Sequence, residues 1–422
     1  MPAPLPTCNV VDTEAQMYDA IIIGARCAGS PTAMLLARQG FRVLLVDRAT
    51  FPSDTISTHI LWPHGAEILA RWGLLGTLAA TGAPPICRHM TFDVGPFALR
   101  GAIPDANDGM GGFCPRRTVL DSLLANAAAE AGAEIRERFT VAELLVTDDV
   151  VVGVRGHGRD GRPIEEHARM VIGADGVHSL VARAVRAVEY DVRPVAACGY
   201  YSYFSGVRQD DIELYVRDHH AFGGAPTNEG LHLVMVNWPA RDFPAVRGDT
   251  EGHVWRAIEA APDFAARVRA GCREEAWYGT AGVPGYFRKP YGKGWALVGD
   301  ASYNRDPITA QGISDAFIDA EMLVEALSGG LSDGGALENR LAAHESARNE
   351  RVRPMYEFTT QLAALEPPPP EMQALFGALR GNQNATNAFL SAITGAIPLP
   401  EFMSKENLGR IMAAAKDVTF HR

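Results

Sequence analysis

The stretch Asp19-Ala-Ile-Ile-Ile-Gly-Ala-Arg-Cys-Ala-Gly29 decides the fold that we expect for this chain. The apolar run Tyr18–Ile23 is typical of a buried parallel strand, and Gly24 ends it. Apolar residues in Ser30–Gln39 follow helical spacing, and Phe41–Val46 is a second apolar run. A strand, a glycine turn, a helix and a strand in this order predict a Rossmann-type βαβ unit.

The turn carries most of a dinucleotide-binding pattern, Gly-x-Gly-x-x-Gly. Gly24 and Gly29 allow the tight turn and the close packing of the helix on the strand, but Arg26 replaces the middle glycine. This departure predicts either a shifted pyrophosphate or an arginine that points outward. The backbone amides around Ala25 and Ala28 still form an anion site at the start of the helix.

The second strand ends at Asp47, where an acid accepts hydrogen bonds from a ribose. Arg48 follows it and is a candidate for binding adenosine phosphates, with a solvated arginine as the alternative. The unit therefore predicts a bound dinucleotide, but it does not distinguish FAD from NAD. The bland alternative is a glycine turn of a parallel sheet that binds no nucleotide.

Composition narrows the class of protein. The chain has 422 residues, of which 47% are hydrophobic, and this length predicts roughly two to three domains. A net charge of −11 argues against nucleic acid and anionic membranes as partners. The sequence contains no run of about 18 apolar residues, so it predicts no membrane-spanning helix. The 6 cysteines are scattered without a Cys-x-x-Cys pair, so we expect no metal site and a reducing, cytoplasmic location.

Two later motifs add to the first turn. Gly173-Ala174-Asp175-Gly176 follows the apolar strand Met170–Gly173. Gly299-Asp300 follows the apolar strand Trp295–Val298 and precedes a loop with Pro307, Gly312 and Ile313. With these three motifs in order, the chain resembles the para-hydroxybenzoate hydroxylase-like FAD superfamily. That superfamily includes aromatic-ring monooxygenases, flavin-dependent halogenases and geranylgeranyl reductases, and the resemblance covers about residues 17–350.

The resemblance implies FAD as the cofactor and NADH or NADPH as the transient reductant. It places Gly299 and Asp300 at the FAD ribose and the Pro307 loop under the isoalloxazine ring, where Pro307 counts as catalytic. The helix that begins at Gly312 and Ile313 would point its amino terminus at flavin N1 and O2, where reduced flavin is negatively charged. Two departures, Ser302-Tyr303 and Thr309-Ala310, fall near the expected flavin.

Five further residues are matched less specifically. Arg117 corresponds to an arginine that reaches the FAD phosphates, or else is a solvated arginine at a helix start. Asp175 corresponds to an element that faces FAD and NAD(P)H, or else stabilises its turn. His59, in the loop 51–59, is a candidate flavin neighbour, proton carrier or covalent attachment point, with a surface or capping histidine as the alternative. Alternation places Tyr201 and Tyr203 on one face of a strand, as candidate substrate contacts or ordinary sheet aromatics.

The domain organisation follows from changes of pattern along the chain. We expect a flexible tail at 1–16, a discontinuous FAD-binding domain of the glutathione-reductase-like Rossmann type at 17–85, 110–190 and 285–360, and a mostly antiparallel substrate-binding β domain at 86–109 and 191–284. Residues 335–364 predict one long helix, and residues 361–422 a helical carboxyl-terminal segment. The fold class is therefore α/β, with an inserted β domain and a helical end.

The function that the resemblance implies most directly is an FAD-dependent monooxygenase. It would use NAD(P)H and O2 to hydroxylate an aromatic or secondary-metabolite substrate through a C4a-hydroperoxyflavin. A halogenase would carry a Trp-x-Trp-x-Ile-Pro motif and a matching lysine, and neither is present. A prenyl reductase of the geranylgeranyl reductase type and a non-enzymatic flavin-binding protein remain as alternatives. A homodimer stays open.

Overall fold

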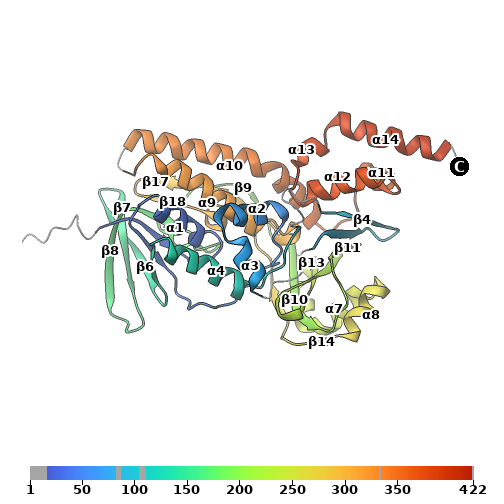
Figure 1. Cartoon of the computed structure of the whole chain (residues 1–422), viewed down its shortest axis with the longest axis horizontal. Coiled ribbons are helices and arrows are strands. Elements are labelled where there is room, and N and C mark those ends of the chain that lie inside the picture. Colours follow the sequence, from blue (N-terminus) through green and yellow to red (C-terminus); the bar gives the residue numbers. More distant parts are fainter. Residues whose placement is uncertain (1–16, 82–86, 104–110, 332–333, 421–422) are drawn as a thin grey trace, which may run out of the picture.

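The computed structural model describes residues 17–81, 87–103, 111–331 and 334–420. The tail expected at 1–16 lies outside these residues. The chain forms two sheet-based units beside each other, with long helix α10 (Gly334–Ala363) along one edge (Figure 1). The expected α/β class with an inserted, mostly antiparallel β unit and a helical end is confirmed.

The first unit is built on a mainly parallel sheet in the order β17-β18-β8-β1-β2-β5. Its strands are β17 (Tyr291–Gly292), β18 (Trp295–Leu297), β8 (Pro163–Gly173), β1 (Tyr18–Ile23), β2 (Val43–Val46) and β5 (Glu134–Arg136). Strand β8 is longer than the expected Met170–Gly173, because its first half pairs with β7 (Val150–His157) in an antiparallel ribbon that continues to β6 (Thr140–Thr147). All parallel strands end at the same edge of the sheet.

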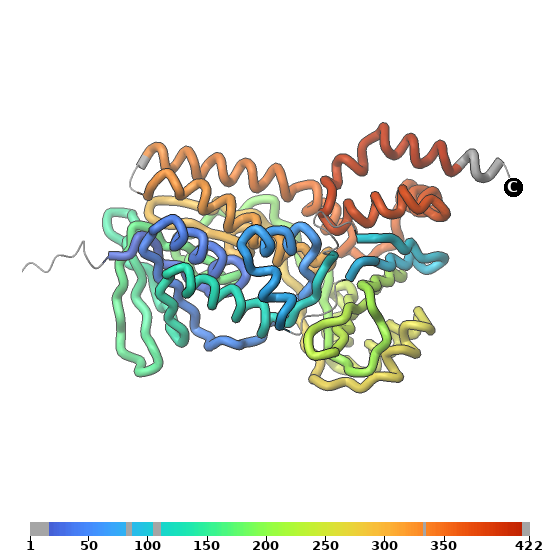
Figure 2. Tube along the Cα trace, in the orientation of Figure 1, coloured from blue at the N-terminus to red at the C-terminus, as the bar shows by residue number. Residues whose placement is uncertain are grey.

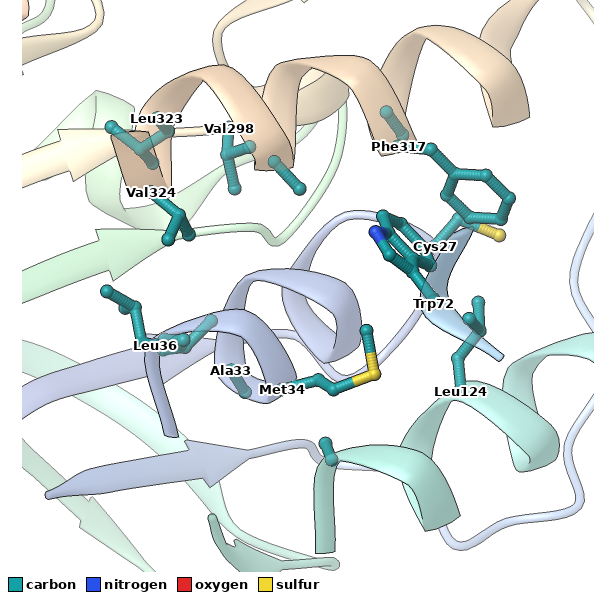
Figure 3. Packing of buried hydrophobic residues seen from close by; sticks show 14 of the residues in the cluster. Cys27, Ala33, Met34, Leu36, Trp72, Leu124, Val298, Phe317, Leu323 and Val324 are labelled. Atoms are coloured by element: carbon teal, nitrogen blue, oxygen red, sulfur yellow. The ribbon is translucent and has the colours of Figure 1, made fainter. Parts of the chain in front are cut away.

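Three helices cover one face of this sheet. Helix α1 (Gly29–Arg38) lies between α4 (Arg117–Glu130) and α9 (Gly312–Ser328), as Figure 3 shows. Cys27 lies beside Trp72 of α2 (Pro63–Trp72) in that view, and the Trp72 ring packs 5.1 Å from that of Phe317. Such aromatic pairs bury large apolar area. This packing fixes where α1 and α9 begin, namely at the carboxyl ends of the parallel strands.

The second unit is a sheet in the order β14-β10-β13-β12-β11-β3-β4, with β15 (Tyr278–Thr280) also paired to β10. These strands are β14 (Cys272–Arg273), β10 (Ala197–Ser205), β13 (His232–Pro239), β12 (His220–Pro226), β11 (Ile212–Arg217), β3 (His89–Asp93) and β4 (Ala98–Ala102). Among the described strands of this sheet, only β11 and β3 pair in parallel. The pattern of short strands did not predict α6 (Phe243–Gly248), α7 (Thr250–Ile258) and α8 (Pro262–Ala270), which cover one face because their apolar sides pack there.

Helix α10 packs along α9 and then reaches the second unit. Four helices follow it: α11 (Pro370–Leu379), α12 (Gln383–Ile393), α13 (Leu399–Phe402) and α14 (Lys405–Phe420). They gather beside β4, and the trace in Figure 2 shows this red end of the chain next to the blue-green β3–β4 segment. Within the described residues, no helix is both long enough and apolar enough to cross a membrane.

Candidate active site

A cavity of about 830 Å³ is lined by both units. The parallel sheet contributes the loops at the carboxyl ends of its strands, and the second sheet contributes residues of β10 and β13. Ligand-binding cavities in proteins usually measure about 300–1,000 Å³, and in open α/β sheets they lie at this edge. The cavity is therefore the candidate site.

The structure brings most of the expected site residues to this cavity. Those that line it are Gly24, Ala28, Asp47, Arg48, Arg117, Asp175, Gly299, Asp300, Pro307, Gly312, Ile313 and Tyr201. Four expected residues, Ala25, Gly29, His59 and Tyr203, lie behind the wall. These motifs lie far apart in the sequence. They meet at the cavity because the parallel strands that carry them run in the same direction.

The first turn is held by sterics and by Asp47. A Cβ on Gly29 would lie 1.8 Å from the Gly24 carbonyl oxygen, so only glycine permits this approach. The Ala25 amide donates to Asp47 Oδ2 at 2.8 Å, and the Ala49 amide donates to Oδ1 at 2.8 Å. Asp47 thus fixes the turn itself and presents its carboxylate at the cavity wall.

Arg26, the residue in place of the middle glycine, has its guanidinium engaged by protein groups. It pairs with Asp121 at 2.6 Å and donates to Ser53 Oγ at 2.7 Å. The completely buried Asp121 also accepts from Arg117 Nε and Nη2 at 3.1 and 2.9 Å. We did not predict Asp121 from the sequence, although its spacing four residues after Arg117 on a helix is a signal for such a pair.

The starts of α1 and α9 offer backbone amides to the cavity. Neither amino-terminal residue, Ala28 or Gln311, caps its helix with a side chain, and α1 has no acid in its first turn. A Cβ on Gly312 would meet nothing within 4 Å, so there is open space in front of α9. Uncapped helix starts facing open space suit a phosphate and a flavin ring that gains negative charge. The residues present thus fit FAD.

Asp300 lies on a turn of the cavity wall. Gly299 has a φ of +62°, and its amide donates to Asp319 Oδ2 at 2.8 Å. Asp319 is also bonded to His344 Nε2 at 2.9 Å, so a buried pair holds this turn. The Asp300 side chain faces the cavity and is otherwise surrounded by protein. This burial raises the pKa of its carboxyl to about 6, while the positive charge of Arg117 opposes the rise.

Asp175 has a structural partner. Its Oδ2 accepts from the Leu180 amide at 2.6 Å, so the side chain caps α5 (Leu180–Ala184). Its Oδ1 is buried without a partner among the described residues, and burial raises the pKa of the carboxyl. The capping contact is a sufficient reason for an aspartate at this position even if no nucleotide binds. Asp175 also lines the cavity, and its Oδ1 has no partner among the described residues, so a contact with a ligand is compatible with the structure.

His59 is completely buried and has a φ of +62°. Burial lowers its pKa to about 3, so the ring is neutral, and its Nε2 shares a hydrogen bond of 2.8 Å with the Tyr203 hydroxyl. As alternation predicts, Tyr201 shares a face with Tyr203, and it lines the cavity with its ring stacked 5.4 Å from Tyr278. His59 therefore reaches the cavity only through its neighbours.

The cavity residues that were not predicted from the sequence include Asp306, Arg305 and Arg348. Asp306 Oδ1 accepts from the Ile308 amide at 3.0 Å, its Oδ2 has no partner among the described residues, and burial raises its pKa to about 6. For Arg305 and Asp306, charged side chains between the Gly-Asp and Pro-Gly motifs were the available signal, whereas Arg348 on α10 lies far from both motifs in the sequence. Groups of three or more metal-binding side chains are absent from the described part of the chain.

Comparison with known proteins identifies the family of the chain that contains this cavity. The family model described as an FAD binding domain matches residues 17–359. The chain belongs to this FAD-binding family. The resemblance to the para-hydroxybenzoate hydroxylase-like superfamily is confirmed, and the protein is an FAD-dependent oxidoreductase.

Relatives of this flavoenzyme include two reductases. A digeranylgeranylglycerophospholipid reductase of Methanosarcina mazei is 30% identical over 336 residues, covering 75% of this chain and 76% of the relative. A second such reductase, from Methanothermobacter thermautotrophicus, is 30% identical over 332 residues, covering 75% and 80%.

Solved structures similar to the flavoenzyme include a halogenase and a probable monooxygenase. The myxobacterial chondrochloren halogenase has a TM-score of 0.76 at 23% identity, covering 95% of this chain and 97% of that one. A probable FAD-dependent monooxygenase from Pseudomonas aeruginosa has a TM-score of 0.68 at 22% identity, covering 89% and 99%. At these identities the likeness shows the shared fold.

Proposed function

We propose that the flavoenzyme is an NAD(P)H-dependent monooxygenase that hydroxylates an aromatic or similarly compact secondary-metabolite substrate. One observation carries the proposal: a single cavity is lined both by the Pro307 loop and by an aromatic and apolar wall. That wall consists of Tyr201, Leu233 and Met235 of the second sheet. A ring bound against Tyr201 would gain the edge or face contacts that aromatic pairs prefer.

The protein's own groups supply binding and proton handling. FAD, when bound, supplies the redox chemistry. We assign the α1 amides and Arg117 to the phosphates and Asp300 to the ribityl or ribose hydroxyls. The α9 amides stabilise negative charge on the flavin ring. Asp306 Oδ2, at the cavity wall with a pKa near 6, holds and releases a proton in the range where proton exchange is efficient.

A second candidate is an FAD-dependent reductase of alkene bonds in a prenyl chain. The two reductases at 30% identity favour it, because both share about three quarters of their length with this chain. Such an enzyme would use the same cofactor site and leave oxygen unused. A non-enzymatic flavin-binding role would require that NAD(P)H fails to reduce the flavin with any ligand.

The deciding experiment supplies the FAD-loaded protein with NADH or NADPH, 18O2 and separate candidate phenols, indoles and prenyl lipids. We expect a product heavier by one labelled oxygen, with no product under anaerobic conditions. Anaerobic formation of a product that has gained two hydrogens, without label in air, would establish the reductase instead.

The cofactor placement is tested separately. Asp300→Ala should lose most of its FAD on purification, because its side chain faces the cavity at the Gly299 turn. Flavin content is measured by absorbance after gel filtration, and a variant with normal content would contradict the assignment.

A further inference from the structure

One lobe of the cavity carries arginines that no motif accounts for. Arg305 follows strand β19 (Tyr303–Asn304), and Arg348 and Arg351 project from α10; all three line the cavity. Arg305 and Arg351 both pair with Asp315, the latter at 3.3 Å. Arg348 precedes Arg351 by about one helical turn, so the two lie on one side of α10. The shared carboxylate of Asp315 therefore holds Arg305 and Arg351 together, and the helix places Arg348 beside Arg351.

Several hydrogen-bond donors in this lobe are buried without a partner. Arg305 is 8% exposed, and only its Nη2 is bonded to Asp315. Its Nε and Nη1 have no acceptor among the described residues. The Tyr303 hydroxyl, beside it, has none either. Because buried donors in folded proteins are almost always satisfied, these atoms point to a missing acceptor.

Arg348 is the most deeply buried of the three arginines. It is 1% exposed, and in the described part of the chain it forms no ion pair. Its bonds go to neutral oxygens, the Asn349 amide at 2.9 Å and the Arg288 carbonyl at 3.3 Å, while Nη1 has no partner. The Phe287 ring, 6.0 Å away, offsets little of the charge. Asp319 lies close enough for the charge of Arg348 to help lower its pKa, but that carboxylate is already bonded to His344 and to the Gly299 amide. A buried guanidinium that keeps an unsatisfied N–H donor is costly unless a ligand completes it.

We propose that Tyr303, Arg305 and Arg348 form a binding subsite for a compact anionic group, a carboxylate or a phosphate. Guanidinium and phenol donors suit the oxygens of these groups, and arginine binds both with two parallel hydrogen bonds. The group is carried by a substrate or is a free ion, and both present the same chemistry. The subsite stands on the cavity geometry and does not depend on whether the enzyme uses oxygen.

The test titrates the FAD-loaded protein with inorganic phosphate and with benzoate, at constant ionic strength set by chloride. Binding is followed by the flavin absorbance spectrum and by the shift of the thermal unfolding midpoint, since a ligand of the native state stabilises it. Arg305→Gln and Tyr303→Phe are the test variants. Arg183→Gln, which removes a charge from an exposed residue lining the same cavity, is the matched control.

We expect wild type and Arg183→Gln to bind at least one of the two anions. The affinity of Arg305→Gln should fall about tenfold to a hundredfold, and that of Tyr303→Phe by a smaller factor. Binding of benzoate alone indicates an organic acid, and binding of phosphate indicates a phosphate group or ion. Equal affinity in all variants, or no binding to wild type, overturns the proposal. So does loss of FAD in Arg305→Gln without anion binding to wild type, which would assign the arginines to the cofactor.

Discussion

Arg26 and Asp121 form an ion pair, with Nη1 and Oδ2 2.6 Å apart, between the first turn and helix α4. The pair explains how an arginine is accommodated where the dinucleotide pattern has glycine. Its guanidinium is drawn toward Asp121 and Ser53, and its Cζ also lies 5.5 Å from the Phe51 ring. The pair also ties the loop after β2 to the turn, whose Ala25 amide is already bonded to Asp47.

Asp121→Asn should destabilise the protein strongly. The substitution leaves Arg26 and the buried Arg117 without their shared carboxylate, and breaking such a pair typically costs about 3 kcal/mol or more. Urea unfolding of the apoprotein measures the loss, and FAD affinity should fall with it because Arg117 lines the cavity. Glu143→Gln, in an exposed pair with Arg155, is the control and should change little. Equal stability of the two variants would contradict this role of Asp121.

Gly312→Ala and Gly29→Ala should behave oppositely. At position 312 a Cβ meets open space, so the apoprotein should melt at the same temperature or higher, while FAD binding weakens because the methyl group takes cofactor space. At position 29 the Cβ would lie 1.8 Å from a carbonyl oxygen, so the fold itself should suffer. Melting temperature and FAD affinity are measured for each. Tight FAD binding by Gly312→Ala would show that the flavin lies elsewhere.

Asp306→Asn should become relatively more stable as pH rises. A free aspartate has a pKa near 4, whereas Asp306 in the fold has a pKa of about 6, so ionisation between these values costs folding free energy. The amide oxygen still accepts from Ile308, and the variant lacks that cost. The variant-minus-wild-type free energy of unfolding should rise by about 2–3 kcal/mol from pH 4 to pH 7. Urea unfolding checks it, with the exposed Asp160→Asn as control; a difference independent of pH would contradict it.

Tyr203→Phe should lower stability without lowering FAD content. The change leaves Nε2 of the buried His59 without its hydrogen-bond partner, at a cost of about 1–3 kcal/mol, and neither residue lines the cavity. Tyr291→Phe is the control, because that tyrosine is buried away from the cavity and its hydroxyl has no hydrogen bond among the described residues. Chemical unfolding and flavin absorbance are the measurements. Loss of flavin in Tyr203→Phe alone would place His59 closer to the cofactor than its position behind the wall suggests.

Local sequence patterns were enough to predict the first strands and helix, and the edge of the sheet at which the site lies. Apolar runs and glycine turns depend on local sterics, so β1, α1 and β2 were predicted to within about two residues. Because parallel strands end at one edge, the motifs at Asp47, Asp175 and Asp300 had to meet there.

The partners of individual side chains depend on how the helices and sheets pack against one another. Asp121 reaches Arg26 because α4 packs beside α1, and His59 turns to Tyr203 because the loop after β2 crosses to the second sheet. The surroundings of Arg348, whose Nη1 has no partner among the described residues, likewise depend on how α10 lies along α9. Such contacts join residues far apart in the chain, and no local pattern records the packing of helices and sheets that brings them together.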